Sequence, residues 1–144
     1  MNKKIILLLL SLVMFVFLFI SCNRSTLNNK YVDIYDIVKK AFLTDKGYTD
    51  DLSKYMSNDV FRKINIYNAY PVNSPEYKKP FKINFDLREV SQIKDKDIIY
   101  VKMIYSVDIK DSQNKTIGGS HNTITFSVKK DGNAWYIFEK EEPA

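Results

Sequence analysis

The hydrophobic positions of the chain follow two periods, first that of a helix and then that of a strand. Between residues 29 and 43, apolar side chains recur at intervals of three and four and draw one helical face: Tyr31, Ile34, Tyr35, Val38, Ala41 and Phe42. Either Asn28 or Asn29 is placed to cap the start of this helix, and Gly47 lies just past its end. The pattern therefore predicts a helix from about Asn29 to Leu43, with its aromatic face in the core.

Two shorter helices and an irregular connection are expected next. Residues 49–51 can cap a helix that carries Leu52, Tyr55 and Met56, and Ser57-Asn58 can cap another whose inner face holds Val60, Phe61 and Ile64. Pro71 ends the helical region because proline cannot continue a helix. The segment 70–80 contains three prolines and is longer than most loops in compact domains, which marks it as a candidate functional loop.

From Phe81 the period changes to two, which is typical of half-buried strands. The inward residues of the first two strands are Phe81, Ile83, Phe85 and Leu87, then Ile99, Val101, Met103, Tyr105, Val107 and Ile109. A polar turn over 111–115 leads to a third strand with Ile124, Phe126 and Val128 inward. An Asp131-Gly132 hairpin signal leads to a fourth strand over 135–139. Helices followed by a four-stranded antiparallel meander predict an α+β fold.

The segment before the first helix has the composition of an export signal. Lys3-Lys4 precede an apolar run over residues 5–20 that is broken only by Ser11, and Ser21-Cys22 follow. The run of 16 residues suits a signal peptide and is shorter than the roughly 20 residues needed to span a bilayer. Cys22 is the only cysteine of the chain, so it cannot form a disulfide within the chain. Its position at the end of the apolar run therefore indicates another role.

The stretch Leu18-Phe19-Ile20-Ser21-Cys22 resembles the lipobox of bacterial lipoproteins, with Phe19 where that family usually has leucine. The resemblance implies that Cys22 is acylated on its sulfur and becomes the first residue after cleavage. It divides the chain into a signal peptide (1–21), a lipidated cysteine with its tether (22–28) and a single α+β domain (29–144). It also implies a lipid-anchored location on the extracytoplasmic face of the cell membrane. The alternative is an uncleaved membrane anchor with an incidental thiol.

The order of elements in the domain resembles that of nuclear transport factor 2-like and cystatin-like domains. The resemblance is carried by the helix over 29–43, the long strands, and the ending Lys130-Asp131-Gly132-Asn133-Ala134-Trp135-Tyr136-Ile137. It implies N-terminal helices packed on a curved sheet in a cone-like arrangement that sometimes contains a pocket. Such domains range from isomerases to assembly modules, so the resemblance does not choose a function.

Charge and composition exclude several kinds of partner and cofactor. The chain of 144 residues has 22 basic and 17 acidic side chains, and loss of Lys3 and Lys4 with the signal lowers the net charge from +5 to +3. This excess is too small to indicate nucleic-acid binding, for which a clustered basic face is expected. One histidine and one lipidated cysteine leave only carboxylates as metal ligands, and the sequence has no glycine-rich phosphate loop. No cofactor or metal is expected.

Candidate catalytic groups are few. His121 is the only histidine, and counting by twos from Ile124 points it outward unless a bulge intervenes. Glu139 is the one carboxylate predicted on the Trp135/Ile137 face. A cone-like enzyme of the isomerase type needs a positioned acid or base inside, so these two residues define the catalytic alternative: a small-molecule-binding or isomerase-like enzyme that uses the interior of the cone. No catalytic constellation is predicted.

One feature favours binding. The outward faces of the second and fourth strands carry apolar side chains that would form an exposed patch: Ile98, Tyr100, Ile104, Tyr136 and Phe138. Partners cover patches of this kind, although a loop or the third helix of the same chain is an equally good cover. The leading hypothesis is a membrane-anchored, non-catalytic binding or assembly module whose partner is a cell-envelope protein or a second copy.

Overall fold

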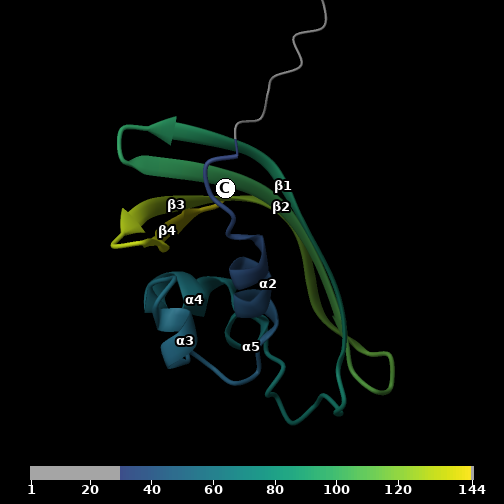
Figure 1. Cartoon of the computed structure of the whole chain (residues 1–144). Coiled ribbons are helices and arrows are strands. Elements are labelled where there is room, and N and C mark those ends of the chain that lie inside the picture. Colours follow the sequence, from purple (N-terminus) through teal and green to yellow (C-terminus); the bar gives the residue numbers. More distant parts are fainter. Residues whose placement is uncertain (1–29, 144) are drawn as a thin grey trace, which may run out of the picture.

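The computed structural model describes residues 30–143, so the predicted signal peptide, Cys22, the tether and the caps Asn28 and Asn29 lie outside the described residues. The helices are α2 (Tyr35–Leu43), α3 (Asp50–Ser53), α4 (Asn58–Ile64) and α5 (Ile66–Ala69). The strands are β1 (Lys82–Asp95), β2 (Ile98–Lys110), β3 (Thr116–Asp131) and β4 (Ala134–Glu141). The strands form one antiparallel sheet in the order β1-β2-β3-β4, which confirms the predicted α+β class. The sheet bends sharply along its length, and the described helices lie on its concave side (Figure 1).

Helix α2 begins six residues later than the periodicity predicts, at Tyr35 instead of Asn29. The side chain of Gln92 accepts hydrogen bonds from the amides of Tyr31 and Val32, at 2.7 and 3.0 Å, and so holds these residues outside a helix. Tyr31, expected in the core, is 40% exposed, whereas Val32 is buried. The helical pattern predicted here was therefore wrong for residues 30–34, because a side chain at least 60 residues away competes for the backbone.

The predicted starts of the next two helices are confirmed. The Thr49 hydroxyl accepts a hydrogen bond from the amide of Leu52, and the Ser57 hydroxyl accepts one from the amide of Val60. The inner residues predicted for these helices are buried with one exception, Tyr55, which is 38% exposed. The buried ones are Leu52, Met56, Val60, Phe61 and Ile64. They face the sheet and contribute to one continuous hydrophobic core.

The inward residues predicted for β2 and β3 are all buried. Two bulges that the sequence pattern does not reveal change the faces of the edge strands. In β1 the register shifts between Glu89 and Ser91, so Gln92 pairs with Val101 and turns to the concave side. In β4, Val128 pairs with Ile137 and Ser127 pairs with Glu139. Phe138 is thus the extra residue of a bulge, and the residues after it have exchanged faces.

The irregular segment over 70–80 is fastened to the turn between β2 and β3 by Asp111, which is 2% exposed. One carboxylate oxygen accepts from the amides of Gln113 and Lys115 at 2.9 and 2.8 Å, and the other accepts from the amide of Lys78 at 3.1 Å. Burial alone would raise the pKa of the Asp111 carboxyl, but these three amides favour the charged form and hold its pKa below the ordinary value. The length of this loop thus has a structural explanation.

The lowered pKa of Asp111 makes a prediction about acid stability. A carboxyl whose pKa is lower in the folded state stabilises the protein fully above its unfolded pKa of about 4 and loses this contribution as the pH falls through the folded pKa. Asp111→Asn should therefore lower the urea midpoint at neutral pH, with the difference from wild type shrinking in acid. Asp97→Asn, an exposed change in the turn between β1 and β2, is the matched control. An equal difference at every pH would contradict this account.

Candidate binding surfaces

Three apolar side chains of β2 lie on the convex side of the sheet, and the exposed Lys102 separates the last of them from the other two. Ile98, Tyr100 and Ile104 lie on the outer face of β2, each half-buried by its neighbours on the sheet. The register places Tyr100 opposite Ile93 of β1, which is 64% exposed. None of the described helices lies on this side (Figure 1). We call the three residues of β2, Ile98, Tyr100 and Ile104, the convex strip.

The two patch residues predicted on β4 lie apart from the convex strip. Tyr136 pairs with Lys129 of β3, and the Lys129 ammonium lies 5.4 Å from the centre of the Phe138 ring. The Tyr48 hydroxyl donates to the Met56 carbonyl at 2.6 Å, and Met56 forms a backbone bridge with Ile137, so the loop after α2 lies beside the edge of β4. Strand β3 lies between the two groups, so the predicted patch is divided and not continuous.

The structure places both residues of the catalytic alternative on the outside. His121 is exposed and pairs with Ser106, as the count from Ile124 predicted. Glu139 was predicted on the face of Ile137, but the bulge at Phe138 turns it to the opposite face, where it is exposed and pairs with Ser127. Ser127 and His121 are six residues apart on β3, a separation of about 20 Å at the strand rise, so the two groups do not meet.

His121 and its neighbours across the sheet have the residue types of a catalytic triad, but their order in space differs from that of a triad. Asp86, Ser106 and His121 are direct neighbours across β1, β2 and β3. In a triad the histidine lies between the nucleophile and the carboxylate, whereas here the serine lies between the other two. This row therefore does not support nucleophilic catalysis.

The bulge in β4 instead brings Glu142 to the concave side, a residue that the sequence pattern did not single out. Its carboxylate accepts hydrogen bonds from the Tyr105 hydroxyl and the Asn122 amide, both at 3.1 Å, and pairs with the Lys140 ammonium at 2.5 Å. Burial is the main cause that raises the pKa of the Tyr105 and Tyr70 hydroxyls beside this group. In the part of the chain that the structure describes, no buried side-chain polar atom lacks a partner. These polar groups satisfy one another and hold the end of the chain on the sheet.

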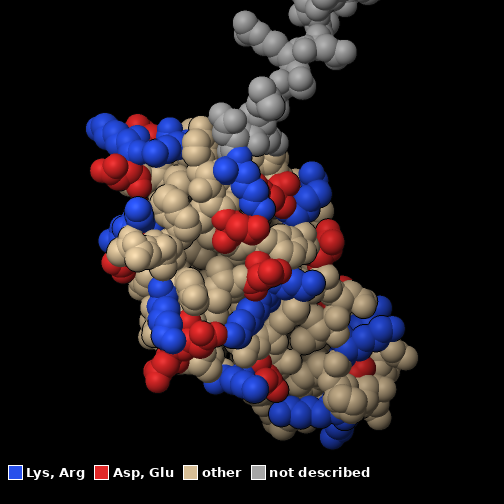
Figure 2. All heavy atoms as spheres, in the orientation of Figure 1, with Lys and Arg blue, Asp and Glu red and all other residues tan. Residues whose placement is uncertain are grey.

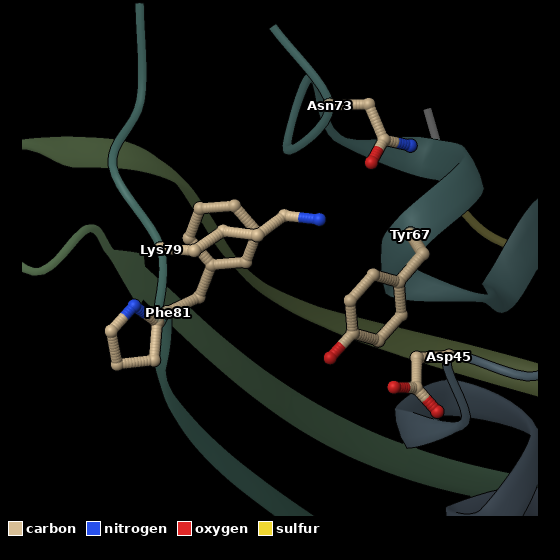
Figure 3. Close-up of a pocket in the computed structure, with 6 residues that line it drawn as sticks. Asp45, Tyr67, Asn73, Lys79 and Phe81 are labelled. Atoms are coloured by element: carbon tan, nitrogen blue, oxygen red, sulfur yellow. The ribbon is translucent and has the colours of Figure 1, made fainter. Parts of the chain in front are cut away.

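Among the surface clefts beside the described helices, two have volumes above 500 Å³. The first, of about 550 Å³, is lined by Asp45, Tyr67, Asn73, Lys79 and Phe81, with Lys79 and Phe81 facing Tyr67 and Asn73 across it (Figure 3). The second, of about 520 Å³, lies between the start of α2 and β4 and is lined by apolar, aromatic and acidic side chains, Trp135 among them. Residues 30–143 contain no cluster of three or more His, Cys, Asp or Glu groups that could hold a metal ion.

Basic and acidic side chains are interspersed over the face shown in Figure 2, with no field of a single sign. No protein-family model matches the chain, and no curated protein matches it either. The candidate surfaces therefore rest on the sequence and the structure themselves. Within the described residues, none of the helices has both the length and the apolar character needed to cross a bilayer.

Proposed function

We propose that this protein is a lipid-anchored extracytoplasmic lipoprotein whose folded domain binds a partner beside the membrane and carries out no catalysis. The sequence supports the anchor through the Lys3-Lys4 pair, the apolar run over 5–20 and Cys22. We also propose that the domain is a cone-like relative of the nuclear transport factor 2-like and cystatin-like domains, with its helices packed on a curved sheet. The apolar core formed by α2, α4 and the concave face of the sheet supports this arrangement.

The convex strip is the observation that carries the binding proposal. Apolar side chains on a sheet face are normally covered, and the described helices all lie on the other side (Figure 1). The interior offers less support for an enzyme, because Val101, Met103 and Ile124 fill it with apolar groups and because His121 and Glu139 lie outside. A cell-envelope protein or a second copy is the partner that this surface suits.

The anchor is tested on the wild-type protein from the membrane fraction of its own cells. We expect an amino-terminal peptide that begins at Cys22, with a mass increase that corresponds to a diacylglyceryl group, because two acyl chains are what stable anchoring requires. A protein that still carries residues 1–21, or that leaves the membrane without detergent, would contradict the proposal.

The binding surface is tested by replacing Tyr100 and Ile104 together with serine. Both side chains lie on the outer face of β2, so we expect crosslinked partner capture in intact cells to be lost, since truncating an interface anchor typically costs about 2 kcal/mol or more. The free energy of unfolding should change much less. Asp59→Asn with Lys63→Gln, an exposed pair on α4 on the other side of the sheet, is the control and should leave capture intact. Unfolding of the serine variant would instead assign this face to the core.

A further inference from the structure

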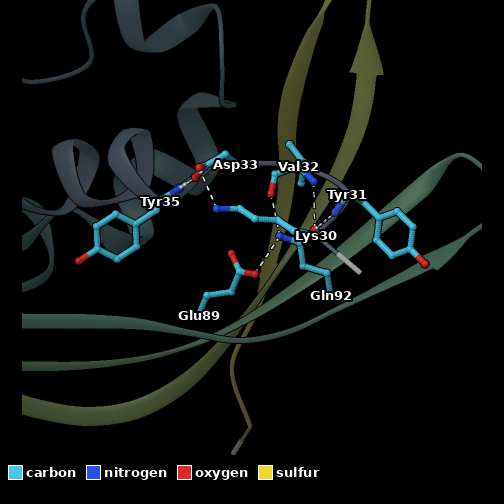
Figure 4. A network of polar contacts seen from close by, with 7 residues as sticks. All are labelled: Lys30, Tyr31, Val32, Asp33, Tyr35, Glu89 and Gln92. Atoms are coloured by element: carbon cyan, nitrogen blue, oxygen red, sulfur yellow. Dashed lines mark hydrogen bonds and ion pairs between the residues drawn. The ribbon is translucent and has the colours of Figure 1, made fainter. Parts of the chain in front are cut away.

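The chain is held to the edge of the sheet at the point where the described residues begin. Gln92 forms a clasp around residues 31 and 32 through both ends of its side-chain amide (Figure 4). Its oxygen accepts from the Tyr31 and Val32 amides, and its nitrogen donates to the Val32 carbonyl at 2.7 Å and to the Glu89 carboxylate at 3.0 Å. Val32 and Ile34 are each 3% exposed, so burial adds to the hydrogen bonds. The clasp therefore fixes Tyr31 and Val32 beside strand β1, at the start of the described chain.

Three large hydrophobic residues are exposed in the part of the chain that the structure describes, and two of them, Tyr31 and Ile93, lie beside the Gln92 clasp. Tyr31 is held by the clasp itself, and Ile93 follows Gln92 in the edge strand β1. Two residues further on, β1 reaches its hairpin with β2, at one end of the sheet. We call this part, residues 93–98 with Tyr31, the hairpin end. Lys94 and Lys96 alternate there with Asp95 and Asp97, so its charges cancel and its contact with a surface must be apolar.

The length of chain before the clasp limits how far this end can be from a lipid on Cys22. Seven residues, 23–29, separate Cys22 from Lys30 and reach at most about 25 Å when fully extended. The 13 residues of β2 carry the sheet about 43 Å from the hairpin end to the turn at 111–115. The hairpin end therefore lies at the end of the sheet that is nearer to Lys30, where the described residues begin.

We infer that the hairpin end of the sheet rests on the lipid bilayer, with Tyr31 and Ile93 inserted at its surface. This inference depends on the lipid anchor proposed above. Tyrosine rings favour the headgroup region, where the apolar ring and the hydroxyl are both satisfied, and an isoleucine side chain gains by leaving water. The anchor keeps the domain at high local concentration beside the bilayer, so a contact too weak for a free protein is populated.

A dye on a single introduced cysteine tests this contact, because an acylated Cys22 has no free thiol. Ile93→Cys and the control Gln113→Cys, in the exposed turn at the far end, are each labelled with an environment-sensitive fluorophore. The lipidated full chain is then placed in phosphatidylcholine vesicles that contain an acyl-chain spin-labelled lipid. We expect blue-shifted emission at residue 93 that the spin label quenches equally at low and high salt. Emission at residue 113 should match that of free dye in water. The urea midpoints of both variants should equal that of wild type, since both positions are exposed.

The contrary outcomes are distinct. Unquenched emission at residue 93 that resembles the control overturns the membrane contact and leaves the anchor standing. A blue shift at residue 93 without quenching by the lipid also overturns it, because a second copy or another protein then covers this end. Dye uptake by the wild-type chain shows a free thiol at Cys22 and overturns both the anchor and the contact.

Discussion

Cys22→Ser is expected to leave the precursor unprocessed and without lipid. In the lipobox that residues 18–22 resemble, the cysteine sulfur accepts the diacylglyceryl group, and a serine hydroxyl at the same place does not replace it. The variant should therefore keep residues 1–21 and migrate as the larger species on a gel, with no incorporation of a labelled fatty acid. The effect is all or none, because no other cysteine is present in the chain.

Ser21→Ala is the matched control for this variant. It changes a neighbouring hydroxyl but keeps the small side chain that signal cleavage sites require, so processing and lipid incorporation should continue. Lipid-labelled protein of mature size from Cys22→Ser would disprove the assignment of Cys22 and favour an uncleaved anchor.

Phe126→Ala is expected to lower the free energy of unfolding by about 3–5 kcal/mol. Phe126 lies on β3 with none of its surface exposed, paired with Val101 on one side and Lys140 on the other. Its removal leaves a cavity in the centre of the core, where the surrounding β-sheet relaxes only in part. Because a domain of this size has a total stability of about 5–15 kcal/mol, the variant should lose much of its resistance to urea.

Ile93→Ala provides the comparison for Phe126→Ala, since Ile93 lies on the outer face and is 64% exposed. Its urea midpoint should correspond to a change within about 0.5 kcal/mol of wild type. A cost below about 1 kcal/mol for Phe126→Ala would show that the inner face of β3 is assigned incorrectly.

The sequence predicts the central strands and the starts of α3 and α4 well because their signals are local. It misses α5, and Tyr55 and Met56, expected on the helix capped by residues 49–51, lie beyond the end of α3 at Ser53. Strict alternation from Ile99 to Ile109 fixes the faces of β2, and serine and threonine caps fix the starts of α3 and α4. The two edge strands, β1 and β4, are predicted less well. A bulge adds one residue and reverses the faces that follow it, and neither Val90 nor Phe138 belongs to a residue type that marks a bulge.

The errors at the candidate sites follow from these same features. Glu139 was assigned to the inner face by counting from Ile137, and the bulge between them puts Lys140 and Glu142 there instead. Ile93 was not singled out because its face depends on the bulge at Val90. Residues 30–34 of the predicted helix are not helical because Gln92 binds the backbone of Tyr31 and Val32. This contact spans about 60 positions and leaves no local signal in the sequence.

The Gln92 clasp also determines how the domain responds to mechanical load. A pull on the chain from its amino side first reaches Tyr31 and Val32, where three hydrogen bonds to one side chain share the force with the burial of Val32. Helix α2 begins only at Tyr35, beyond this point, so the load is delivered to the long edge strand β1 and spares the helix. A domain built in this way resists being unravelled by a force applied to its amino side.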